Sequence, residues 1–173
     1  FGFVRNDTAG ILLAALVVLA LSVWAAAGHT AELLDWLRGR WKLILAGEVL
    51  FFAAFALMAF LRSANPEILG TEKPMELAFI NAALDSPGFP PRDPWLSGFA
   101  ISYYHFGYIL TAMLARLSGV PGTMAFNLML ALIFGLASLG AYGILYNLNR
   151  GSSLRLPLLG PLFLLVISNV EGL

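Results

Sequence analysis

Long apolar runs constrain this chain more than any other feature. Residues 10–28 form a stretch of 19 residues without a charge, and residues 123–145 form another of 23. Residues 43–61 are equally apolar apart from Glu48. A helix of about 20 apolar residues crosses the hydrocarbon core of a bilayer. These three runs therefore predict membrane-spanning helices.

Two further runs extend this prediction. Residues 99–117 are apolar to near their end, and the shorter run 156–168 contains two prolines. None of the runs alternates with a period of two, as the strands of a membrane barrel do. We expect an all-α, polytopic transmembrane bundle of about five spans within one domain, residues 1–173, the fifth span being kinked or re-entrant.

Composition agrees with an integral, multi-pass protein of the cell membrane. The chain is 60% hydrophobic and 12% charged, whereas soluble domains are about 45–50% apolar and about 25% charged. Its formal net charge is zero, which gives no electrostatic case for a nucleic-acid partner. The sequence opens on Phe1 and ends inside an apolar run, so we expect it to be part of a longer protein.

The charges of the segments between the apolar runs indicate which side of the membrane each segment faces. Residues 29–42 combine leucines on one helical face with tryptophans and the basic cluster 38–42, which predicts a short interfacial helix. By the positive-inside rule this side is cytoplasmic, and the long loop 62–98 is extracytoplasmic. Five spans would place Arg150 and Arg155 outside, against that rule.

Within the long loop, Thr71–Leu84 has the pattern of an amphipathic helix lying on the membrane or against the bundle. Thr71 is a good N-cap, and Glu72 lies in the first turn, where the helix dipole favours a carboxylate. Glu72 and Glu76 share a face. They are either a solvated acidic face or a carboxylate pair that serves as a general base or as hard-cation ligands.

A stiff proline-rich segment follows, because each of Pro87, Pro90, Pro91 and Pro94 fixes φ. It presents Arg92, Asp93 and Trp95. These three are either a surface ion pair with an aromatic interface anchor or the source of a second carboxylate in a site.

Aromatic residues begin the next run. Tyr103, Tyr104, His105 and Tyr108 lie within two turns, and we expect Tyr104 and Tyr108 to share a helical face. Tyrosines are common at membrane boundaries. His105 can serve as a proton shuttle, a cofactor ligand or a helix-cap partner.

Two features inside the runs complete the predictions. Glu48 is an intramembrane carboxylate, which marks either a functional site or an ion pair with Arg116. Small residues spaced by four in the run 123–145 predict close helix packing within the bundle; they are Ala131 with Gly135, and Ala137 with Ala141.

Two long motifs carry a family resemblance. They are "EKPMELAFINAALDSPGFPPRDPWLSGFAISYYHFGY" at 72–108 and "LSGVPGTMAFNL" at 117–128, with "SNVEG" at 168–172 as a third. The combination resembles the uncharacterised multi-spanning family of bacteria and archaea named for a YYY tyrosine motif. This chain has His105 at the third tyrosine position.

The layout of that family looks like the GT-C membrane glycosyltransferases, which transfer sugars from polyprenyl-phosphate donors. The resemblance implies that Glu72 deprotonates the acceptor hydroxyl and that Asp93 is a second catalytic acid, while a basic group or a divalent metal stabilises the leaving phosphate. Substrate would then be bound by Glu76, Arg92, Trp95, Tyr103, Tyr104, His105 and Tyr108.

Other functions compete with this one. The chain could be a non-enzymatic accessory subunit that packs against other subunits of a larger membrane complex, and a stoichiometric partner on purification would distinguish it. A pigment or haem binder through His105 would be coloured when purified. Transport is a further alternative, although only the short run 156–168 has the broken character of a transporter helix.

Overall fold

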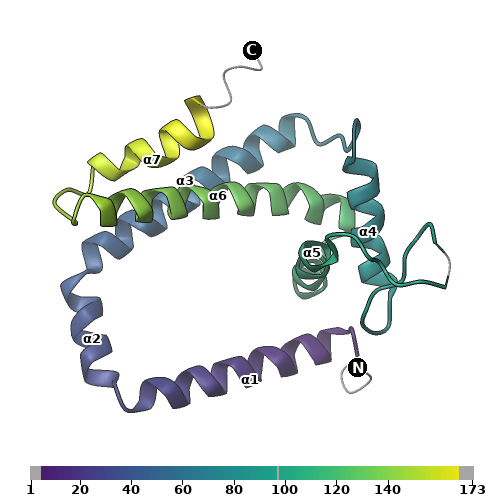
Figure 1. Ribbon diagram of the computed structural model, residues 1–173, viewed down its shortest axis with the longest axis horizontal. Coiled ribbons are helices and arrows are strands. Elements are labelled where there is room, and N and C mark those ends of the chain that lie inside the picture. Colours follow the sequence, from purple (N-terminus) through teal and green to yellow (C-terminus); the bar gives the residue numbers. More distant parts are fainter. Residues whose placement is uncertain (1–4, 97, 168–173) are drawn as a thin grey trace. The chain divides into compact units, whose positions relative to one another are not determined.

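The computed structural model describes residues 5–96 and 98–167, and helices dominate it (Figure 1). The long and medium helices are α1 Thr8–Ala27, α2 Thr30–Gly39, α3 Trp41–Ala64, α4 Lys73–Asp85, α5 His105–Ser118 and α6 Gly122–Leu148. A short irregular stretch follows, made of η1 Leu156–Leu158, α7 Leu159–Pro161 and the π-helical η2 Leu162–Val166. The all-α prediction is confirmed.

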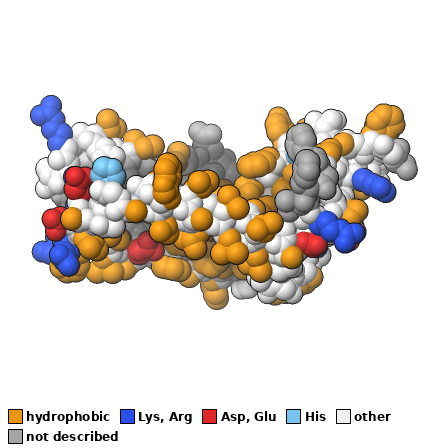
Figure 2. All heavy atoms as spheres, turned by 90° about the horizontal axis from the view of Figure 1, so that it is seen from below, with side chains coloured by type: hydrophobic (Ala, Val, Ile, Leu, Met, Phe, Trp, Pro, Cys, Tyr) orange, Lys and Arg blue, Asp and Glu red, His pale blue; other side chains and the backbone are white. Residues whose placement is uncertain are grey.

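Three helices, α1, α3 and α6, are long and apolar enough to cross a membrane. Their hydrophobic side chains are largely exposed, and such side chains dominate the face displayed in Figure 2. The other two predicted spans are not confirmed. Helix α5 has only 14 residues, because residues 99–104 precede it without helical structure. The helical stretch Leu156–Val166 is shorter than a span requires, and the motif at 168–172 lies outside the described residues.

The chain forms two compact units, residues 1–29 with 66–129, and residues 30–65 with 130–173. In the first unit, α4 packs along α5, and α1 also contacts α5. Phe79, Ile80 and Ala83 of α4 are buried, as are Ala112 and Ala115 of α5. Small side chains on α5 let the larger ones of α4 approach closely, which explains how two short helices form a core.

In the second unit, α3 runs antiparallel to the later part of α6. A Cβ added at Gly47 would lie 3.1 Å from Leu139, and one at Gly135 would lie 3.0 Å from the Phe51 ring. Ala131 is also fully buried. The predicted close packing on the Ala131 and Gly135 face is therefore found within this unit. Small residues let two helix backbones approach closely, and such packing favours helix association in lipid.

Candidate functional site

The candidate site begins where α4 begins. Gly70 and Thr71 both have left-handed backbone conformations, with φ of +79° and +48°. The N-cap is consequently Glu72, and its side chain makes no capping hydrogen bond. The prediction that Thr71 caps this helix is wrong, because the helix begins at Lys73 and Thr71, with its positive φ, lies one residue too early to be the N-cap. A β-branched residue with positive φ is a strained outlier of the kind that clusters at functional sites.

An aromatic cluster surrounds the buried ring of Phe79, which is 3% exposed. The centroid of the Phe79 ring lies 5.4 Å from that of Tyr108, 5.6 Å from that of Trp95 and 6.1 Å from that of Tyr103. These separations are typical of favourable aromatic pairs. We call these four residues the Phe79 cluster. It joins three of the predicted substrate-binding residues through one residue of α4.

Tyr104 is placed differently from its expected position. It is the N-cap of α5 and is largely exposed, with its ring 4.4 Å from that of Tyr103. Tyr103, rather than Tyr104, therefore joins Tyr108 at Phe79. The expectation that Tyr104 and Tyr108 share a helical face is wrong, because α5 begins only at His105.

Glu72, the N-cap of α4, and Glu76, in its first turn, act on the phenols of this cluster. Partial burial raises the pKa of Tyr103 above its ordinary value, and the negative charge of Glu72, together with a hydrogen bond to Glu72, raises it further. Burial also raises the pKa of Tyr108, with the charge of Glu76 as the next contribution. In both cases the environment disfavours the phenolate. The structure thus brings Glu72, Glu76, Tyr103 and Tyr108 together.

Asp93 organises a turn. Its Oδ1 accepts hydrogen bonds from the backbone amides of Trp95, at 2.8 Å, and Leu96, at 2.9 Å. Its own amide donates to the carbonyl of Phe99 at 2.9 Å. Such an Asx-type turn fixes the backbone that carries Trp95. The structure thus gives Asp93 a structural part, and its catalytic part stays a prediction.

Arg92 and His105 occupy the edges of the site. The backbone amide of Arg92 donates to Ser86 Oγ at 2.9 Å, and an isolated antiparallel bridge pairs Arg92 with Ala100. The Arg92 side chain is exposed, whereas His105 is half-buried as the first residue of α5. Among the residues described, no three His, Cys, Asp or Glu side chains lie together as a metal ion would require, and the expected divalent metal stays a prediction.

Contacts that the sequence did not predict hold the C-terminal end of α4. Asn6 is buried, and its Nδ2 donates to the carbonyls of Ala83, at 2.6 Å, and Ser86, at 2.8 Å. Arg116 of α5 donates to the carbonyl of Leu84. These contacts satisfy carbonyl groups that the end of a helix leaves unpaired. An asparagine ahead of a helix is too common a feature for the sequence to reveal this contact.

The pairing of Glu48 with Arg116 stays a prediction. Glu48 lies on α3 in the second unit, and Arg116 lies on α5 in the first. The geometry alone does not test the catalytic or the substrate-binding assignments, although six of those residues lie in or beside the Phe79 cluster.

Comparison with known proteins gives the family but no activity. No curated protein and no solved structure matches the chain. Residues 1–173 match the family described as "Uncharacterized membrane protein (DUF2298)". The match covers every residue of the sequence and agrees with the three apolar helices. This chain therefore belongs to the DUF2298 family of uncharacterized membrane proteins.

Proposed function

We propose that this protein transfers a sugar from a polyprenyl-phosphate donor to an acceptor hydroxyl, with Glu72 as the general base. One observation carries the proposal: the Glu72 carboxylate is not used for helix capping and lies beside Tyr103 of the Phe79 cluster. The GT-C-like order of the motifs gives the reaction class. A positioned carboxylate next to aromatic surfaces is a suitable arrangement for binding and activating a sugar.

The transfer can be written with its atoms in balance. The acceptor hydroxyl oxygen attacks the anomeric carbon and forms the new glycosidic bond. The bond between that carbon and the phosphate oxygen breaks, and polyprenyl phosphate leaves with the electron pair. Glu72 takes the proton of the hydroxyl. Exposed Trp95 and Tyr104 offer flat apolar faces to the sugar, and Asp93 holds the backbone at Trp95.

We further infer that the Phe79 cluster is extracytoplasmic. In the second unit α3 and α6 are antiparallel, and Arg40, Lys42 and residues 151–154 line one cavity. Five alternating spans would make these helices parallel, whereas three spans, α1, α3 and α6, make them antiparallel. Three spans also put both basic segments, 38–42 and 150–155, on one side of the membrane. The positive-inside rule makes that side cytoplasmic and the connection 65–121 extracytoplasmic.

The test is sugar transfer by the full-length protein reconstituted with polyprenyl-phosphate mannose or polyprenyl-phosphate glucose. Release of polyprenyl phosphate is measured for the unchanged protein, Glu72→Gln and Glu76→Gln. We expect Glu72→Gln to lose activity by about 10²-fold or more while it still binds the donor. Glu76→Gln, one turn away, is the comparison: as a predicted substrate-binding residue it should raise KM and leave kcat largely unchanged.

Asp93 provides a second comparison. Asp93→Asn keeps an oxygen acceptor for the turn but removes the charge, whereas Asp93→Ala removes both. If Asp93 only positions Trp95, Asp93→Asn stays active and Asp93→Ala does not. An equal loss in both variants would make Asp93 a second catalytic acid. Absence of polyprenyl phosphate release with either donor would overturn the enzyme proposal.

Exposed aromatic residues outside the three candidate spans favour a second candidate function. Trp95, Tyr104 and Phe106 are all more than 60% exposed, and such residues are enriched at protein interfaces. They fit the accessory-subunit alternative, in which this surface packs against another membrane subunit. Purification from native membranes decides it, since a stoichiometric partner lost on Phe106→Ala supports an interface.

A further inference from the structure

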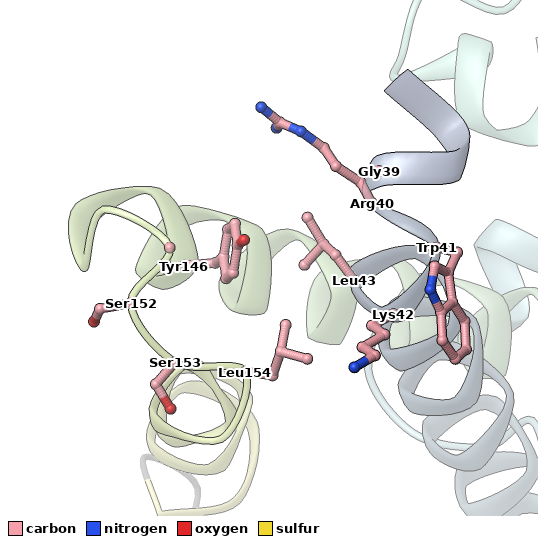
Figure 3. Close-up of a pocket in the computed structure, with 10 residues that line it drawn as sticks. Gly39, Arg40, Trp41, Lys42, Leu43, Tyr146, Ser152, Ser153 and Leu154 are labelled. Atoms are coloured by element: carbon pink, nitrogen blue, oxygen red, sulfur yellow. The ribbon is translucent and has the colours of Figure 1, made fainter. Parts of the chain in front are cut away.

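The second unit contains a cavity of about 460 Å³ where α2 meets α3. One wall is formed by residues 39–43, and the opposite wall by Tyr146 and residues 151–154 (Figure 3). Lys42 points toward the opposite wall, while the guanidinium group of Arg40 extends outward from the rim. This volume is within the usual range of about 300–1,000 Å³ for small-molecule sites.

The charge of this cavity is not neutralised. Arg40 lies over the ring of Trp36, at 5.2 Å from its centroid, and Lys42 over that of Trp41, at 5.7 Å. A cation–π contact positions a cation without cancelling its charge. Within the described ranges, neither cation forms an ion pair with a carboxylate. The cavity is therefore suited to an anion.

The opposite wall adds hydrogen-bond donors. Ser153 Oγ accepts from the backbone amides of Arg155, at 3.1 Å, and Leu156, at 3.4 Å. A hydroxyl that accepts in this way still has its own proton to donate. Tyr142 holds this wall in place, because its hydroxyl donates to the carbonyl of Leu154 at 3.1 Å. Lys42 and Ser153 both line this cavity, so its walls offer a phosphate group a cation and a hydroxyl donor.

A second, more apolar cavity of about 400 Å³ adjoins the first and shares Arg40, Leu43 and Tyr146 with it. Its walls come from α3 and α6 and include Ile44, Gly47, Leu139 and Gly143. Glu48 also lines it. The charged cavity thus continues into an apolar groove along two membrane-spanning helices. This order of charged and apolar surfaces matches the headgroup and acyl chain of a lipid.

We propose that these joined cavities bind an anionic phospholipid, with its phosphate between Lys42 and Ser153 and one acyl chain along the groove beside Gly143. The flanking tryptophans are typical of the membrane–water interface, the depth at which headgroup phosphates lie. Basic pockets between membrane helices bind anionic headgroups on the cytoplasmic side. The site lies in the unit that does not contain Glu72, and so it is independent of the glycosyltransferase proposal.

Binding is measured on the full-length protein in detergent, by native mass spectrometry with phosphatidylglycerol and phosphatidylcholine. We expect phosphatidylglycerol to be preferred and the double change Arg40→Gln with Lys42→Gln to weaken its binding about tenfold or more. Arg38→Gln is the matched control. It removes one positive charge from the same cluster, but Arg38 is exposed, its Nη1 lies 3.9 Å from Asp35 Oδ1, and it does not line the cavity.

Gly143→Leu tests the groove. A Cβ at Gly143 meets nothing within 4 Å, so the new side chain enters open space, and leucine favours a helix more than glycine does. We expect it to weaken phosphatidylglycerol binding several-fold and to leave the thermal shift produced by inorganic phosphate unchanged. Gly140→Leu, on the same helix and equally unobstructed, should affect neither.

Three results would overturn the assignment. Equal binding of phosphatidylglycerol by the double variant and by Arg38→Gln would show that Arg40 and Lys42 do not form a headgroup site. Equal binding of phosphatidylglycerol and phosphatidylcholine would show that the cavity does not select an anionic lipid. A phosphate-induced shift that depends on Lys42, with lipid binding unaffected by Gly143→Leu, would identify soluble phosphate as the ligand in place of a lipid.

Discussion

The two units satisfy their polar groups by different means. In the first, side chains such as Asn6, Arg116 and Asp93 bond to backbone groups at the ends of short helices and in turns. In the second, long helices satisfy their own backbones and approach each other at Gly47 and Gly135. Short helices leave a larger fraction of their amides and carbonyls unpaired, so they depend on side-chain partners, whereas long helices in lipid depend on close packing.

The charges of the two units differ as well. Glu72 and Glu76 face phenols in the first unit, and Arg40 and Lys42 face indoles in the second. The first arrangement is the basis of the proposed general base, and the second is the basis of the proposed anion site. The difference shows that this chain has two polar regions of opposite charge, each beside aromatic rings.

The largest effect that would test this comparison is on helix packing in the second unit. Gly135→Leu places a side chain where a Cβ alone would lie 3.0 Å from the Phe51 ring and 3.3 Å from its carbonyl oxygen. We expect the free energy of unfolding to fall by about 3 kcal/mol, the cost of overpacking. It is measured by denaturant titration in detergent. Gly140→Leu on the same helix should change the free energy of unfolding little. An equal loss in both variants would show that the loss does not come from the contact with Phe51.

The next effect concerns polar satisfaction in the first unit. Asn6→Ala leaves two buried carbonyls, those of Ala83 and Ser86, without their donor. We expect the free energy of unfolding to fall by about 2 kcal/mol, with faster amide hydrogen exchange near Ser86. Asn65→Ala, an exposed asparagine at the end of α3, is the control. Unchanged exchange near Ser86 would mean that Asn6 does not hold this helix end.

The smallest effect is a titration. Glu72→Gln removes the carboxylate that raises the pKa of Tyr103, so that pKa should move toward its ordinary value near 10. The neutral phenol is the favoured form in the folded state. Its contribution to stability is therefore present below about pH 10 and lost as pH rises through the raised pKa.

The titration is followed by NMR of ¹³C-labelled tyrosine, with Tyr103→Phe to assign the signal. Glu32→Gln, on α2 in the other unit, should leave the Tyr103 pKa unchanged. A Tyr103 pKa that does not respond to Glu72→Gln would separate Glu72 from the Phe79 cluster.

Prediction from sequence succeeded where the signal was local. Apolar runs predicted α1, α3 and α6, and the four-residue spacing of Ala131 and Gly135 predicted the packing face of α6. It was weaker at residues 99–104, where an apolar composition predicted helix and the chain is not helical. The backbone there is engaged with earlier residues, since Ile101 donates to the carbonyl of Pro91 and Phe99 accepts from Asp93. Composition cannot reveal hydrogen bonds between distant segments.

The residues of the candidate site were predicted singly, but their grouping was not. Glu72, Trp95, Tyr103 and Tyr108 were each selected for their chemistry, while Phe79 was assigned only to an apolar stripe. Phe79 is the residue at which three of them meet. Its role depends on the packing of α4 against α5, which brings the aromatic residues before and within α5 onto one ring.

The sequence by itself determined that this is a membrane protein. A run of about 20 apolar residues suffices to span a bilayer, and such a run is visible without knowledge of tertiary contacts. It also determined which residues carry the chemistry. Tertiary structure decided that Thr71 does not cap α4, that Tyr103 rather than Tyr104 joins Tyr108, and that Lys42 and Ser153 line one cavity. The last two depend on contacts between segments far apart in the chain. Such contacts are fixed by the packing of whole helices rather than by the preferences of neighbouring residues.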